Sequence, residues 1–60
     1  MIVEFRNAKT NWFYRYENAI SVVLTNANEM VLRWIDLTKP EVNNVHIIPL
    51  KLIKGLKITE

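Results

Sequence analysis

The chain has 60 residues, half of them hydrophobic, with a net charge of +2, one His, one Gly and no Cys. This composition excludes disulfides, thiolate zinc sites and cysteine nucleophiles, and a single glycine leaves no phosphate-cradling loop. The small positive charge does not by itself indicate a nucleic-acid-binding protein. Sixty residues predict a single domain, residues 1–60. In so small a domain the free energy gained by burying apolar surface nearly equals the free energy lost by ordering the chain, so self-association is a natural source of stability.

The N-terminal sequence and the apolar runs bear on localisation. Glu4 and Arg6 interrupt the apolar residues Ile2, Val3 and Phe5, so no signal peptide is predicted. The apolar runs are far too short to span a bilayer, and we expect a cytoplasmic protein without membrane contacts. Seven Asn and five Lys beside seven Ile suggest an AT-rich coding genome, as in a phage, another mobile element or a low-GC bacterium.

The first third of the chain favours strands. Residues 1–6 are rich in β-branched and aromatic side chains, and residues 7–11 are polar and turn-like. Residues 12–16 form the most aromatic stretch. If it is extended, its side chains divide between two faces, with Trp12, Tyr14 and Tyr16 on one and Phe13 and Arg15 on the other.

Residues 18–37 fit two structures. Residues 19–25 and 30–35 alternate as two strands joined by a short Asn-rich loop, which predicts a hairpin. A helix capped by Asn18 is the alternative and would give an α+β fold. The many β-branched residues and two mid-helix Asn favour the hairpin. The helical stripe would consist of Ile20, Val23, Leu24, Ala27, Val31, Trp34 and Ile35.

The C-terminal third predicts a loop over residues 38–44 and a strand over 45–48 that Pro49 closes. Residues 50–53 fit one tight turn, Gly55 breaks it, and a last short strand follows at 56–58. This order of strand, proline, single turn, glycine and strand resembles the closing segment of SH3-like small barrels.

The resemblance covers about a quarter of the chain and implies a fold, not a ligand. The Ala-Leu-Tyr-Asp-Tyr stretch and the paired Trp of peptide-binding SH3 domains are absent, so a proline-rich ligand is not implied. We predict a mainly β fold, either a small SH3-like barrel or a curled antiparallel meander, with about five strands.

Catalysis is not predicted. His46 lies in an apolar strand, Ser21 is the only Ser, and nothing in the sequence links the two. The carboxylates are scattered, and one His with dispersed acids is poor material for a metal site. We therefore expect a protein that is not an enzyme, with no metal, no cofactor and no small-molecule substrate.

The aromatic stretch is the strongest candidate for a binding surface. Bases stack on rows of aromatic rings, and nearby Arg side chains hold phosphates. The same rings are also natural core residues in so small a fold. Lys51, Lys54 and Lys57 recur every third residue, a pattern typical of a solvated edge that blocks strand pairing. The candidate binding residues are Trp12, Tyr14, Arg15, Tyr16 and Arg33.

Apolar residues on both faces of the central strands point to a partner. Val23, Val31 and Ile35 alternate with a second apolar set, and a 60-residue sheet cannot bury both faces unless it curls or meets another chain. We expect a small protein–protein binding module that binds itself, most simply as a homodimer, or another protein, such as a host protein if its origin is a phage. A small RNA- or DNA-binding regulator that uses the aromatic and Arg face is the alternative.

Overall fold

The fold is mainly β, as predicted, and has six strands instead of about five. The computed structural model describes all 60 residues. Its one helical segment is a three-residue 3₁₀ turn, and no helix is long and apolar enough to cross a membrane. The elements are β1 (Ile2–Asn7), β2 (Phe13–Tyr16), β3 (Ala19–Leu24), β4 (Glu29–Ile35), β5 (Asn43–Pro49), η1 (Leu50–Leu52) and β6 (Ile53–Thr59).

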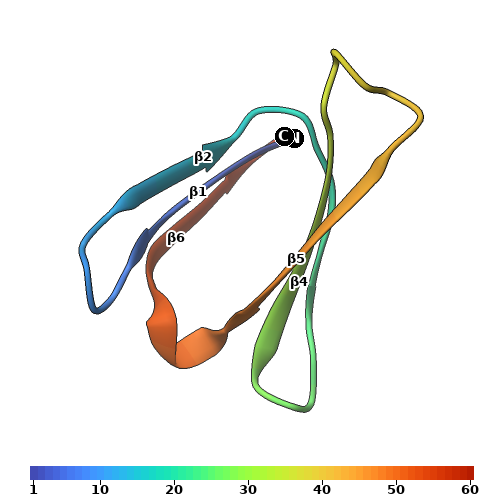
Figure 1. Ribbon diagram of the computed structural model, residues 1–60. Coiled ribbons are helices and arrows are strands. Elements are labelled where there is room, and N and C mark those ends of the chain that lie inside the picture. Colours follow the sequence, from blue (N-terminus) through green and yellow to red (C-terminus); the bar gives the residue numbers. More distant parts are fainter.

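The strands form two antiparallel three-stranded sheets that enclose the core in a barrel-like arrangement (Figure 1). We call them the β1 sheet, in the order β2-β1-β6, and the β4 sheet, in the order β3-β4-β5. Near one end the Met1 amine donates to the Ala19 carbonyl and the Ala19 amide donates to the Met1 carbonyl, both at 3.1 Å. Near the other end the Ala8 amide donates to the Leu52 carbonyl at 2.8 Å, which continues the pairing of β1 with β6 into η1, the segment that connects the two sheets along the chain.

The central hairpin is confirmed, and the helical alternative over residues 18–37 is wrong. β3 pairs antiparallel with β4, so that Val22 lies opposite Leu32 and Leu24 opposite Met30. The stiff β-branched residues fit the pleated surface better than a helical one. Asn28 supplies the left-handed conformation of the connecting turn, with φ 58°, which Asn tolerates better than most residues.

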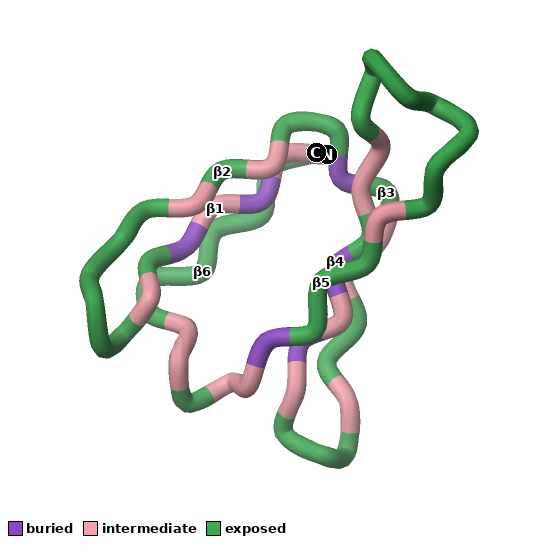
Figure 2. The backbone as a smooth tube through the Cα atoms, viewed as in Figure 1, coloured by how far each residue is buried: buried purple, intermediate pink, exposed green.

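The core lies between the two sheets and is entirely apolar. Leu32 and Met30 at the centre of β4 are fully buried, as is Val3 of β1. Figure 2 shows buried segments on β1, β4 and β5 and at the start of β3. Because so few residues are buried, each contributes a large part of the stability. The buried residues are Val3, Phe5, Ala19, Met30, Leu32 and Ile48.

The C-terminal segment follows the predicted order with shifted boundaries. The 3₁₀ turn ends at Leu52, one residue earlier than expected, and β6 starts at Ile53 instead of residue 56. Gly55 does not end an element but lies within β6 at φ +63°. The register between β1 and β6 shifts by one residue there, the geometry of a bulge with glycine in the left-handed region.

The predicted loop over residues 38–44 is shorter than expected, because Asn43 and Asn44 already belong to β5. Its first turn is held by Asp36, whose Oδ1 accepts hydrogen bonds from the Thr38 amide at 2.9 Å and the Thr38 hydroxyl at 2.7 Å. These two bonds lower the pKa of the Asp36 carboxyl below its ordinary value.

Candidate functional site

Two of the predicted binding residues point into the protein. Tyr14 and Tyr16 share one side of β2, as expected, and both rings stack on the buried Phe5, with centroid distances of 5.2 Å and 6.2 Å. Trp12 does not join them, because β2 begins only at Phe13 and the Trp12 side chain is 69% exposed. The expected face of three rings is therefore reduced to two, and those two extend the core.

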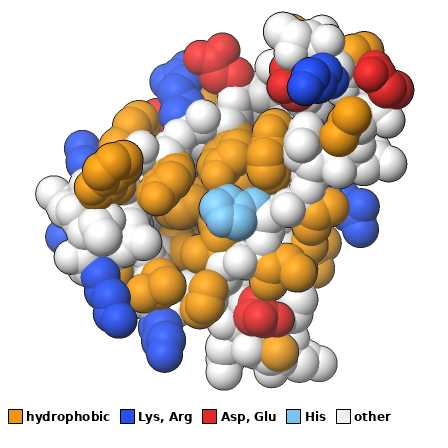
Figure 3. Space-filling view, in the orientation of Figure 1, with side chains coloured by type: hydrophobic (Ala, Val, Ile, Leu, Met, Phe, Trp, Pro, Cys, Tyr) orange, Lys and Arg blue, Asp and Glu red, His pale blue; other side chains and the backbone are white.

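Tyr16 belongs to a polar and aromatic cluster that bridges the two sheets. Its ring lies 5.0 Å from that of Trp34, and its hydroxyl forms a 2.9 Å hydrogen bond with His46 Nδ1. The His46 side chain is exposed and lies among hydrophobic side chains in the middle of the face shown in Figure 3. Trp34 and His46 were not predicted as site residues, because they lie 18 and 30 positions from Tyr16 in sequence.

A shallow cavity of about 170 Å³ adjoins this cluster between the two sheets. Most of the side chains in its wall are apolar, and none is Lys, Arg, Asp or Glu. The residues that line it are Phe5, Asn7, Tyr14, His46, Ile47, Ile48, Pro49 and Leu52.

Partial burial raises the pKa of the Tyr16 phenol above its ordinary value of 10.0, and the neighbouring Tyr14 adds to the effect. The folded chain therefore holds this proton more tightly than the unfolded chain. The resulting stability is fully present below pH 10.0 and is lost as pH rises through the pKa of the folded state.

We expect the free energy of unfolding to fall above pH 10 less steeply for Tyr16→Phe than for the parent chain, because the variant lacks the shifted phenol. Urea unfolding of both proteins, followed by circular dichroism from neutral to alkaline pH, measures the two slopes. Identical slopes would contradict the assignment of the raised pKa to Tyr16.

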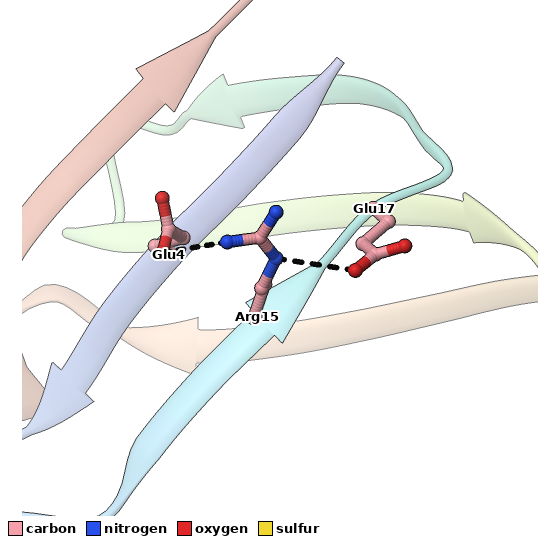
Figure 4. A network of polar contacts seen from close by, with 3 residues as sticks. All are labelled: Glu4, Arg15 and Glu17. Carbon is pink, nitrogen blue, oxygen red and sulfur yellow. Dashed lines mark hydrogen bonds and ion pairs between the residues drawn. The ribbon is translucent and has the colours of Figure 1, made fainter.

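The outer face of the β1 sheet is charged, and the predicted binding residue Arg15 lies on it. Arg15 Nη1 lies 3.4 Å from a Glu4 carboxylate oxygen, and Arg15 Nε lies 3.3 Å from Glu17 Oε1 (Figure 4). Two carboxylates therefore surround one guanidinium, and the trio carries a net negative charge. Arg15 is poorly suited to hold a phosphate in this arrangement.

Other residues of the same outer face are better placed for an anionic ligand. The guanidinium carbon of Arg6 lies 5.2 Å from the centroid of the Phe13 ring, and Phe13 is 50% exposed. Lys54 lies directly opposite Arg6 in the sheet, and Lys57 lies opposite Glu4. Both lysines are on β6, an edge strand, as their predicted role requires, whereas Lys51, the third lysine of the predicted set, lies in η1.

The outer face of the β4 sheet is apolar. Val23, Val31 and Ile47 lie side by side across its three strands, and Val23 and Ile47 are 53% and 55% exposed. Val45 adjoins this row, and Arg33, a predicted binding residue, lies opposite Val45 in the register. We call Val23, Val31, Val45 and Ile47 the apolar face. The alternation of side chains along a strand already assigned Val23 and Val31 to this face from the sequence. The same alternation, applied to residues 43–49, assigns Val45 and Ile47 to it.

The register places Ser21 and His46 on opposite faces of the β4 sheet. Ser21 pairs with Arg33 on the outside, whereas His46 pairs with the buried Leu32 on the inside. The two side chains therefore do not form a nucleophile and base pair. No three His, Asp or Glu side chains gather in one place.

Comparison of the chain with protein-family models, with curated proteins and with solved structures finds no match. The candidate surfaces are therefore distinguished by their geometry and chemistry alone: a charged outer face on one sheet and an apolar outer face on the other.

Proposed function

We propose that this chain is a small non-catalytic protein-binding module whose contact surface is the apolar face of the β4 sheet. The observation that carries the proposal is the row formed by Val23, Val31 and Ile47 across three strands, in which Val23 and Ile47 are exposed and Val31 is half-buried. Contiguous exposed apolar surface on a small soluble protein is typical of an interaction site.

The chemistry of the apolar face suits a protein partner. Its side chains are β-branched, and their restricted χ1 angles leave little conformational entropy to lose on binding. The row of Val23, Val31 and Ile47 contains no charged residue. In the adjacent row the only charged residue is Arg33, which lies between Ser21 and Val45. Such a face favours an apolar contact over recognition of phosphates.

Binding through the apolar face predicts an affinity that holds or rises as salt is added. Peptides selected from a displayed random library against the immobilised full-length chain provide the probe. Their addition is expected to shift the amide resonances of β3, β4 and β5. Shifts confined to the β1 sheet, or the absence of any selectable peptide, would contradict the proposal.

Two matched valine substitutions test the same surface. Val45, on the apolar face, and Val42, in the loop before β5, are both 44% exposed. Val45→Thr is expected to weaken peptide affinity roughly fivefold to tenfold, because it replaces a methyl group by a hydroxyl in the contact. Val42→Thr is expected to leave the affinity unchanged. Equal affinities of the two variants would place the contact elsewhere.

A nucleic-acid-binding regulator is a second candidate, favoured by one specific observation. The exposed Phe13 ring contacts Arg6, the exposed Trp12 directly precedes Phe13 in sequence, and Lys54 lies opposite Arg6 in the sheet. Exposed aromatic rings beside cations form a stacking surface for single-stranded nucleic acid.

Tryptophan fluorescence titrated with mixed-sequence single-stranded RNA and DNA at two salt concentrations separates the candidates. Saturable quenching that weakens steeply with salt would support the nucleic-acid candidate over the protein-binding module. If the chain is a protein-binding module, we expect its tryptophan emission to stay unchanged when either nucleic acid is added.

A further inference from the structure

We propose that two copies of this chain associate through β3, which pairs antiparallel with the β3 of the second copy and extends the β4 sheet across both molecules. The inference rests on the proposed function, because it names a second copy as a protein that the β4 sheet binds. The observation behind it is a difference among the four edge strands, β2, β3, β5 and β6.

The other three edges each carry a charged residue or a proline, which disfavour strand pairing. β6 has Lys54 and Lys57 and a bulge at Gly55, and lysines and bulges are both common protections of an edge. β2 has only four residues and carries the charged Arg15. β5 ends in Pro49, which has no amide hydrogen to donate.

β3 has neither a charged residue nor a proline; its register with β4 shifts between Ala19 and Ser21, and the pairing is regular from Ser21 to Leu24. From Ala19 to Asn28 the chain has no charged residue and no proline. Ile20 and Leu24 are 51% and 58% exposed, so apolar side chains accompany the unpaired backbone. The Ala19 backbone bonds to Met1, which leaves residues 20–24 as the free edge. An apolar edge without charge or proline is a template for another strand.

A second copy is the partner that this edge fits. An antiparallel pair of identical strands is related by a two-fold axis, so one strand serves as both template and partner. The contact brings no like charges together, although each chain carries a net charge of +2. Arg6, Lys54 and Lys57 lie on the β1 sheet, in the other layer of the protein, and Arg33 lies on β4, one strand away from the proposed contact. The pairing also joins the apolar faces of the two copies into one surface.

Sedimentation equilibrium of the full chain, from micromolar to millimolar concentration, tests the pairing. We expect a monomer–dimer equilibrium in the parent protein. Ile20→Lys combined with Leu24→Lys should lower the association constant at least roughly 100-fold, because like charges then face each other across the two-fold axis. Leu37→Lys with Ile58→Lys adds the same charge at exposed apolar sites elsewhere and should leave association nearly unchanged.

Charge reversal separates lost pairing from lost folding. The chain with Ile20→Glu and Leu24→Glu should not self-associate, yet it should form a heterodimer with the lysine variant, because opposite charges then meet. A parent chain that stays monomeric at millimolar concentration overturns the inference, as does a dimer that the lysine pair does not weaken, or the absence of a heterodimer. None of these outcomes bears on peptide binding at Val45, so the proposed function stands or fails separately.

Discussion

Replacing Phe5 by alanine is expected to leave the protein largely unfolded at 25 °C. The Phe5 side chain is only 2% exposed, and both Tyr14 and Tyr16 stack on its ring. Removing a buried Phe costs about 3–5 kcal/mol, because the ring's burial is lost and a cavity remains. A domain of this size without disulfides or metals has a total stability of about 3–5 kcal/mol.

Phe13→Ala is the matched control for Phe5→Ala, since both residues lie in the β1 sheet. Phe13 is 50% exposed and contacts Arg6 through its ring face, so its removal is expected to cost about 1 kcal/mol or less. Urea unfolding followed by circular dichroism measures both variants. Equal losses of stability would contradict the assignment of Phe5 to the core and Phe13 to the surface.

Replacing Gly55 by valine is expected to lower the free energy of unfolding by about 2 kcal/mol, the second-largest effect we predict. Gly55 has φ +63°, a conformation that is a marked outlier for a β-branched residue. An added Cβ would meet no heavy atom within 4 Å, so the loss arises from backbone strain and not from a clash.

Gly55→Asn distinguishes strain from other effects of a side chain at this bulge. Asn adopts the left-handed conformation more readily than most residues, as Asn11 and Asn28 do in this chain, with φ 63° and 58°. We expect Gly55→Asn to retain most of the stability that Gly55→Val loses. Thermal unfolding of both variants measures the difference, and equal losses would rule out the strain argument.

The two outer faces give this small protein a clear division of surface chemistry. The β1 sheet presents charges, some neutralised in the Glu4, Arg15 and Glu17 trio, whereas the β4 sheet presents Val23 and Ile47. The apolar face and the β3 edge, which has no charged residue and no proline, belong to the same sheet, so we expect the protein contacts there. The charged face keeps the other side of the molecule solvated.

The sequence by itself determined the strands, because β-branched and aromatic residues alternate with period two and turn residues separate them. It also placed the tight turn after Pro49 and favoured the hairpin over the helix, since Val22, Val23 and Val31 suit a pleated surface. These features depend on local conformational preferences, which a short stretch of chain expresses without help from the rest.

Only the tertiary structure decided which side of each strand became the interior. Period two separates Tyr14 and Tyr16 from Phe13 and Arg15, but the opposing sheet decides which pair packs against the core. The contact of Tyr16 with His46, 30 residues away, likewise depends on how the two sheets meet. Such long-range contacts have no local signature, and for this reason only the structure shows that Tyr14 and Tyr16, two residues of the predicted aromatic site, pack against the core.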